Sequence, residues 1–300
     1  MKKSHQVCLW AAFLGAVATS FAQEKYEENY MAEFRGGEPV GEITDGTAVF
    51  SYNAGGFASF EGARTDFEIG GTDMTWSIWW YYRIDGDTQE VKFPQPDSAT
   101  YVGNTATLTW ADVDGRGLFS AELVHVLDEE STSGATLTNT MTLTNISLAT
   151  VDINLFQYAD FDVAGASNDE ASLNNDPDYI ALTDNATANS INTAEIRAAG
   201  NTNYQVTVYS TTDPLVLRAF LNDTALNDLD NTGLPFGPAD FTGAFQWDTI
   251  IPLDGSYAVE TTYAIGDTCA PQPIDPITVD PDVLFSDGFD LGPAVPCAPQ

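Results

Sequence analysis

The sequence predicts an all-β fold, a large two-sheet antiparallel β-sandwich with long strands. Apolar and polar residues alternate with a period of two in many segments, and Gly- and Asp-containing turns separate these segments. No stretch shows sustained helical periodicity. Many strands joined by short connections are typical of a sandwich or a barrel, and we favour two big sheets packed face to face.

The clearest strand signal runs from Ala135 to Asn145. Five threonines lie on one face, and mostly apolar residues lie on the other: Leu137, Asn139, Met141 and Leu143. This pattern is typical of a half-buried strand, so we expect the threonine face to meet solvent.

The same pattern predicts ten further strands, with turns such as Gly70-Gly71 and Asp254-Gly255 between them. They are Ala48–Tyr52, Phe57–Phe60, Asp66–Ile69, Thr75–Ile84, Thr105–Ala111, Leu118–Leu127, Asp152–Val163, Tyr204–Ser210, Ala244–Ile251 and Tyr257–Ile265. Residues Leu215–Leu229 could hold a short helix, although Asn and Asp residues crowd the segment.

The chain is expected to divide into four parts. Residues 1–22 have a basic start, an apolar run and the small-x-small pattern Ser20-Phe21-Ala22, which predict an export signal peptide. An acidic lead-in (23–46), the β-sandwich domain (47–266) and a Pro/Asp-rich tail (267–300) would follow. The mature protein is then extracellular, on the cell surface or periplasmic, and no later stretch approaches a membrane span.

The chain is strongly acidic. Loss of Lys2 and Lys3 with the signal reduces the 10 basic residues to 8, against 44 acidic residues, which leaves a net charge of −36. Such a surface repels nucleic acid and anionic membranes. A salty medium, bound divalent cations or plain solvation of the surface would each accommodate the charge.

Two cysteines remain after signal removal, Cys269 and Cys297. Two cysteines in an exported chain favour a disulfide, here one that closes a loop over the C-terminal tail, although two free thiols are the alternative. No Cys-x-x-Cys pattern indicates a redox site.

Acidic residues at and after one strand suggest a cation site. Asp160 and Asp162 would share one strand face, about 7 Å apart, and like charges so placed favour a cation, a basic partner or a proton. An acid- and amide-rich loop follows, with Asp169, Asp176 and Asp178. Calcium binds such oxygen ligands, so these five residues are the predicted Ca²⁺ ligands; a solvated strand end and loop is the alternative.

The aromatic strand Trp76–Tyr82 suggests a second site. Alternation places Trp76, Trp80 and Tyr82 on one side, where their rings could stack on a sugar. Core packing of a strand covered on both faces is the alternative. The charge disfavours stacking on nucleic-acid bases.

The single mature histidine, His125, lies within an apolar strand, which favours a hydrogen-bonded core histidine over a catalytic one. A histidine-rich zinc site is excluded because zinc needs several His or Cys ligands. The residues indicate no catalytic set, no phosphate-binding glycine loop and no nucleophile elbow.

Two segments, Leu155–Asp162 and Gly243–Asp248 with the following Asp254-Gly255-Ser256-Tyr257, carry a resemblance. Over residues 47–266 the chain resembles uncharacterised exported bacterial β-sandwich proteins, many of which end in a PEP-CTERM sorting signal. That signal has no counterpart in this tail, where Leu284-Phe285-Ser286-Asp287-Gly288-Phe289 is similar to a short terminal motif of some gammaproteobacterial exported proteins. The resemblance implies no activity and no catalytic residue.

The sequence therefore favours a secreted or cell-surface non-enzymatic protein that could bind calcium, glycan or another extracellular-matrix component. The alternative is a glycan-active hydrolase or lyase that uses Asp160 or Asp162 as acid or base on a β-sandwich scaffold. The fold class alone does not choose between them.

Overall fold

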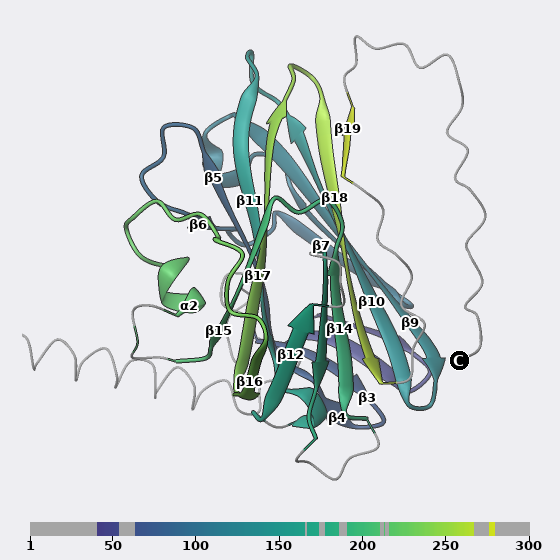
Figure 1. Ribbon diagram of the computed structural model, residues 1–300. Helices are drawn as coiled ribbons and strands as arrows, with labels where there is room; N and C mark the ends of the chain where they lie inside the picture. The colour runs from purple at the N-terminus through teal and green to yellow at the C-terminus, as the bar shows by residue number, and fades with distance from the viewer. Residues whose placement is uncertain are drawn as a thin grey trace, which may run out of the picture.

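The computed structural model describes residues 41–53, 64–165, 167–173, 178–185, 191–210, 213, 216–266 and 276–279. These residues form a nearly all-β sandwich, as predicted (Figure 1). The strands form three sheets, and neighbouring strands within each sheet pair antiparallel.

The largest sheet has ten strands, in the order β16-β12-β13-β14-β18-β10-β9-β8-β7, with β19 also pairing with β18. Their bounds are β7 Ser98–Val102, β8 Thr105–Trp110, β9 Phe119–Ser131, β10 Gly134–Asn145, β12 Asp169–Leu173, β13 Tyr179–Thr183, β14 Thr193–Ala198, β16 Phe236–Ala239, β18 Ser256–Gly266 and β19 Ile277–Val279.

The two smaller sheets have four and five strands, in the orders β1-β2-β3-β4 and β15-β17-β11-β5-β6. Their bounds are β1 Gly41–Asp45, β2 Ala48–Asn53, β3 Arg64–Ile69, β4 Thr72–Asp73, β5 Thr75–Ile84, β6 Val91–Lys92, β11 Val151–Phe161, β15 Asn203–Val208 and β17 Phe241–Ile251. Short helices lie at η1 Val113–Gly115, η2 Val163–Gly165 and α2 Leu217–Phe220.

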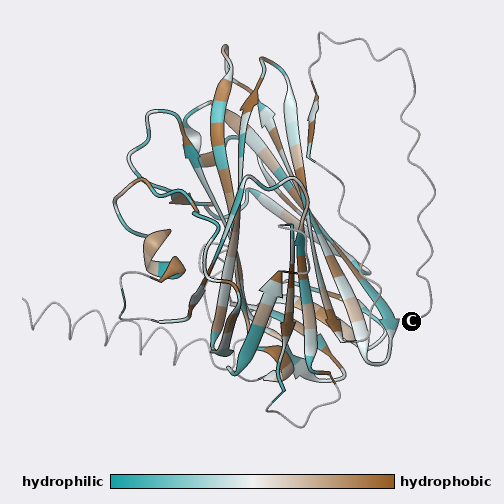
Figure 2. Ribbon diagram, viewed as in Figure 1, coloured by the Kyte–Doolittle hydropathy of each residue, from teal (hydrophilic) through white to brown (hydrophobic). Residues whose placement is uncertain are grey.

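The two smaller sheets together cover one face of the ten-stranded sheet. Tyr52 of β2 bonds His125 of β9, while Phe161 of β11 packs against Tyr263 of β18 with ring centroids 5.4 Å apart. His125 and Tyr263 lie on the same face of the large sheet, since the pairing aligns His125 with Asn139 and Asn139 with Thr261. One continuous core fills the space between the layers, and Figure 2 shows apolar residues alternating with polar ones along the strands.

The long strands follow the sequence prediction closely. β5 spans the predicted Thr75–Ile84, and β10 buries Leu137, Asn139, Met141 and Leu143. The threonine face of β10 is only half-buried beyond Thr136, as alternation requires. The predicted strand Phe57–Phe60, the signal peptide (1–22), Cys269 and Cys297 lie outside the described residues.

Nine of the observed strands were not predicted: β1, β4, β6, β7, β12, β13, β14, β16 and β19. Three of them lie in segments that were expected to have another structure. β12 begins at Asp169, inside the segment expected to be an acid-rich loop, because Ala171 alternates into the core. β1 lies in the expected acidic lead-in, where Ile43 is buried against β2. β19 lies in the expected tail and pairs with Ser256–Ala258 of β18.

His125 is a hydrogen-bonded core histidine, as its strand context predicted. It is fully buried, with Tyr52 Oη 2.5 Å from Nε2 and Asn139 Oδ1 2.5 Å from Nδ1. Because an amide oxygen only accepts, Nδ1 carries the proton and Tyr52 donates to Nε2. Burial lowers the pKa of His125 from 6.5 to about 4, so the ring is neutral in this network.

The described part of the chain contains no helix long and apolar enough to span a bilayer. The longest regular helix among these residues, α2, has four residues.

The His125 network predicts an acid-dependent loss of stability. The unfolded chain takes up a proton at His125 between pH 6.5 and 4 while the folded chain does not, so the free energy of unfolding falls as pH drops through that window, by about 3 kcal/mol in total. Urea unfolding of wild type and His125→Gln from pH 4 to 8 measures the difference. We expect the wild-type advantage to shrink below pH 6.5; a difference that is constant across this range contradicts the assignment.

Candidate functional site

The outer face of the five-stranded sheet has an apolar middle and two polar ends. Trp79, Tyr81, Phe156 and Tyr158 lie in the middle and pack under Leu217, Leu221 and Leu229 of the segment 216–230. This covering segment includes α2 and closes the face that does not meet the main core (Figure 1). Polar side chains that leave the sheet at either end of β11 are therefore the candidates for binding or chemistry.

The predicted aromatic platform lies in the core. Trp80 and Tyr82 face the ten-stranded sheet and are 0% exposed, with Trp80 stacked on Trp247 at 6.2 Å between ring centroids. Tyr82 packs edge-on against Phe93 and donates its hydroxyl to Asp114. Trp76, near the start of the same strand, is half-buried. Stacking on a sugar needs an open ring face, which Trp80 and Tyr82 lack here, so their placement matches the core-packing alternative.

Four carboxylates gather at the C-terminal end of β11, and we name them the acid cluster: Asp160, Asp162, Asp169 and Asp240. Asp160 is 2% exposed and lies between Ser77 of β5 and Thr242 of β17. The hydroxyl of Tyr158 donates to Asp160 Oδ2 at 3.5 Å.

The other members of the acid cluster come from three further points of the chain. Asp162 follows β11, and its backbone N–H donates to Met74 O at 3.0 Å. Asp169 opens β12, where Oδ1 accepts from the N–H of Val163 at 3.1 Å while the buried Oδ2 has no hydrogen-bond partner. Asp240 links β16 to β17 and accepts from the N–H of Tyr209 at its carbonyl.

Burial and mutual repulsion both oppose ionisation of the acid cluster. Burial, followed by the charges of Asp162 and Asp240, raises the pKa of Asp160 well above its usual value, and Arg218 of α2 offsets part of this effect. Burial and the charge of Asp162 raise the pKa of Asp169 to about 8. The same causes raise the pKa of Asp240 to about 6. A proton or a cation therefore stabilises this end of the sheet.

The structure brings together three of the five predicted calcium ligands and separates a fourth. Asp178 lies at the opposite end of the β12–β13 pair from Asp169, and a strand of five residues separates the two by about 16 Å. Its Oδ2 accepts a hydrogen bond from Gly200 N at 2.9 Å. Asp176 lies outside the described residues. Asp240 was missed, because only the pairing of Thr242 with Asp160 brings it close. Among the described residues, no three His, Cys, Asp or Glu side chains are placed to hold a metal ion.

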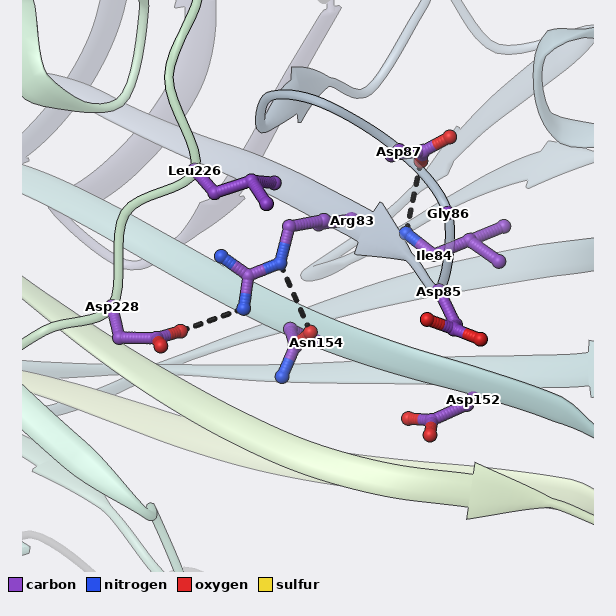
Figure 3. Close-up of a pocket in the computed structure, with 9 residues that line it drawn as sticks. All are labelled: Arg83, Ile84, Asp85, Gly86, Asp87, Asp152, Asn154, Leu226 and Asp228. Atoms are coloured by element: carbon purple, nitrogen blue, oxygen red, sulfur yellow. Dashed lines mark hydrogen bonds and ion pairs between the residues drawn. The ribbon is translucent and has the colours of Figure 1, made fainter.

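A pocket of about 270 Å³ occupies the other polar end, near the start of β11 (Figure 3). Arg83 of β5 forms one wall. Its guanidinium donates to Asn154 Oδ1 at 3.1 Å, to Glu90 Oε1 at 2.8 Å and to Asp228 Oδ1 at 2.6 Å. Glu90 is buried and also accepts from the backbone N–H of Asn227. The network therefore attaches the covering segment to the sheet.

Comparisons with known proteins establish only the fold. No family model matches the chain, and no curated protein matches it. A bacterial glucoamylase complexed with acarbose has a similar structure, with a TM-score of 0.51 and 10% identity over 77% of this chain and 32% of that chain. A polysaccharide lyase gives a TM-score of 0.44 and 8% identity over 75% of this chain and 33% of that one. The chain thus spans about a third of the length of these structures.

The acid cluster predicts an alkaline loss of stability that Asp169→Asn relieves. Because the folded pKa of Asp169 lies above its unfolded value, its ionisation costs stability as pH rises from about 4 to 8. In the presence of a chelator, Asp169→Asn should be more stable than wild type at pH 8 by about 1 to 2 kcal/mol, after allowance for solvent screening, and its advantage should vanish near pH 4. Urea unfolding measures both values. Asp178→Asn, the control, should show no such pH-dependent gain.

The Arg83 network predicts a large effect from a single substitution. Arg83→Met leaves Glu90 buried without its ion pair, so we expect a loss of about 3 kcal/mol in the free energy of unfolding. Arg116→Met breaks the more exposed Arg116–Asp87 pair and should cost no more than about 1 kcal/mol. Equal losses in the two variants would show that Glu90 does not depend on Arg83.

Proposed function

We propose that this chain is an exported, non-enzymatic β-sandwich protein that binds Ca²⁺ at the acid cluster. The observation that carries the proposal is Asp169, a 0% exposed carboxylate whose Oδ2 forms no hydrogen bond within 3.5 Å. Burial and the charge of Asp162 oppose its ionisation, and the backbone N–H groups of Val163 and Phe241 offset only part of this effect on its pKa. A buried carboxylate oxygen of this kind is costly unless it gains a proton or a cation.

Calcium fits the chemistry of the acid cluster. It binds six to eight oxygens in flexible geometry, and carboxylates, backbone carbonyls and water all serve as ligands. The four carboxylates come from β11, the residue after it, β12 and the β16–β17 link. Since they do not converge on one point, ion binding would draw them together by side-chain rotation. It would thereby tie β12 and β16 to the end of the five-stranded sheet.

Export and the surroundings of the protein belong to the same proposal. The signal pattern of residues 1–22 and the net charge of −36 in the mature chain fit an extracellular, cell-surface or periplasmic setting with divalent cations available. A glycan or another matrix component is the partner that this setting suggests.

One observation favours the alternative, a glycan-active hydrolase or lyase. Asp160 has a raised pKa in a buried site beside the Tyr158 hydroxyl, and a carboxyl group with a raised pKa is what general acid catalysis requires. A substrate would have to displace the Arg218 end of the covering segment to reach Asp160, because Asp160 is 2% exposed. The binding function needs no such displacement, and we favour it.

A calcium titration followed by thermal unfolding tests the proposal. An ion that binds only the folded state at a hundred times its dissociation constant adds about 2.7 kcal/mol, which corresponds to a rise of about 5 to 10 °C in Tm for a domain of this size. We expect this rise for wild type and for Asp178→Asn, and its loss for Asp169→Asn.

Two outcomes would contradict the proposal. A Tm that stays constant up to millimolar calcium excludes binding at the acid cluster. An equal rise in wild type and Asp169→Asn places the ion elsewhere. Release of reducing or unsaturated sugars from a polysaccharide panel, abolished by Asp160→Asn, would establish the enzymatic alternative instead.

A further inference from the structure

The end of the sandwich at which β11 begins carries exposed apolar side chains. Two connections cross there from one layer to the other, residues 146–150 between β10 and β11 and residues 252–255 between β17 and β18 (Figure 1). β19 lies beside them, because Val279 pairs with Ser256 at the start of β18. Five of the eight large apolar side chains that are exposed in the described part of the chain lie at this end, so they form a patch rather than a scatter. We name this patch the apolar tip: Ile146, Leu148, Ile250, Leu253 and Val279.

Hydrogen bonds fix the connection that carries the most exposed of these side chains. The buried amide of Asn145, the last residue of β10, donates to Ala149 O at 2.7 Å and to Pro252 O at 2.9 Å, which ties the two connections together. Its Oδ1 accepts from the backbone N–H of Ser147 at 2.9 Å, and Ser147 Oγ accepts from Ala149 N at 3.3 Å. Leu148, 98% exposed, is therefore presented on a backbone that is already ordered, and this lowers the entropy cost of a contact made there.

Exposed carboxylates surround the apolar tip. Asp152 pairs with Ile250 across β11 and β17, and Asp254 follows Leu253 in the turn. Asp85 lies at the same end, because its backbone N–H donates to Asp152 O at 3.1 Å. Two such ends repel each other in dilute salt. The repulsion weakens as salt shortens the Debye length, from about 30 Å at 0.01 M to about 3 Å at 1 M.

The size of the apolar tip fits a second copy of the chain. The five side chains together expose roughly 500 Å², within the range of about 300 to 600 Å² for the largest patch on a monomer, which is often functional. Two copies placed end to end would bury about 1,000 Å² in total, the lower limit for a specific but weak interface. A two-fold axis would let the same apolar side chains of each copy cover those of the other. The surrounding carboxylates disfavour an anionic membrane as the occupant.

We propose that the apolar tip is a self-association surface, at which a second copy of this chain binds end to end when salt screens the surrounding carboxylates. Burial of Leu148 supplies the largest share of the apolar contact, since it is the most exposed member. Salt strengthens this dimer because like charges oppose it, whereas salt weakens an interface held by ion pairs. The apolar tip and the acid cluster lie at opposite ends of β11, so the inference does not depend on the calcium proposal.

Analytical ultracentrifugation of the mature chain tests the proposal, in a chelator and at about 0.05 M and 1 M NaCl. We expect a monomer at the lower salt concentration and a monomer–dimer equilibrium at the higher one. Leu148→Ser should raise the dimer dissociation constant at least about tenfold, since both copies lose the contact, and should leave Tm unchanged because Leu148 is 98% exposed. The matched control is Val102→Ser. Val102 is 74% exposed and lies at the other end of the β8–β9 pair, so this variant should dimerise like wild type.

Four results would overturn the proposal. The first is a monomer at both salt concentrations. The second is a dimer that weakens as NaCl rises, which would indicate an ionic interface. The third is equal weakening by Leu148→Ser and Val102→Ser, which would indicate non-specific salting-out. The fourth is binding of monomeric wild type, but not of Leu148→Ser, to phosphatidylcholine vesicles, which would assign the apolar tip to a lipid surface instead.

Discussion

Burial of the five-stranded sheet on both faces is the constraint that places every candidate site of this protein. Its inner face meets the ten-stranded sheet through Trp80, Leu155 and Trp247, and its outer face is closed by the leucines of the covering segment. The middle of β11 therefore has no solvent-facing side. Polar groups that must contact water, ions or ligands are confined to the two ends of the strand.

The scarcity of basic residues affects the charge balance at the two ends of β11. The chain has 10 basic residues for 44 acidic ones. Five of the basic side chains have partners within the fold: Arg83, Lys92, Arg116, Arg197 and Arg218. Arg83 pairs with buried Glu90, and Lys92 lies 3.9 Å from the ring centroid of Trp79. In the acid cluster Arg218 approaches Asp160, but burial and the repulsion between the carboxylates still raise the pKa values of Asp160, Asp169 and Asp240. Protons and external cations are the species left to balance them.

Local patterns predicted the long strands but missed most of the short ones, and they did not identify the neighbours of each strand. Alternation located β5 and β10, because the order of apolar and polar side chains along a strand shows which of its faces is buried. β12 was missed because its five residues include only Ala171 as a buried apolar residue, among acids typical of a loop.

The candidate sites depended on pairings that no local pattern contains. Asp160, Asp162 and Asp169 were predicted as neighbours because they are close in sequence, whereas Asp240 joins them through the β11–β17 register. Asp178 is near Asp169 in sequence but lies at the other end of a hairpin. The aromatic strand allowed either a platform or a core strand. The ten-stranded sheet covers Trp80 and Tyr82, and residues 216–230 cover Trp79 and Tyr81 on the other face, so only the positions of these distant elements distinguish the two.

The covering segment is held in place by its contacts with the five-stranded sheet. A helix of four residues is far shorter than the roughly 12 to 15 needed for independent stability, so contacts with the sheet must hold α2. Polar groups of the sheet supply them: Thr207 Oγ1 accepts from Leu217 N at 3.0 Å, and Gln246 Oε1 accepts from Leu229 N at 2.8 Å.

Residues that anchor the covering segment cannot change their contacts without exposing the aromatic face beneath it. Arg83 and Glu90 belong to this group, because they hold Asn227 and Asp228. Asp85 and Asp152 lie outside it, since their exposed carboxylates are not bound to the segment. The charge at Asp85 and Asp152 can therefore vary while the fold persists, whereas a change at the buried Asp160 or Asp169 of the acid cluster alters stability together with charge.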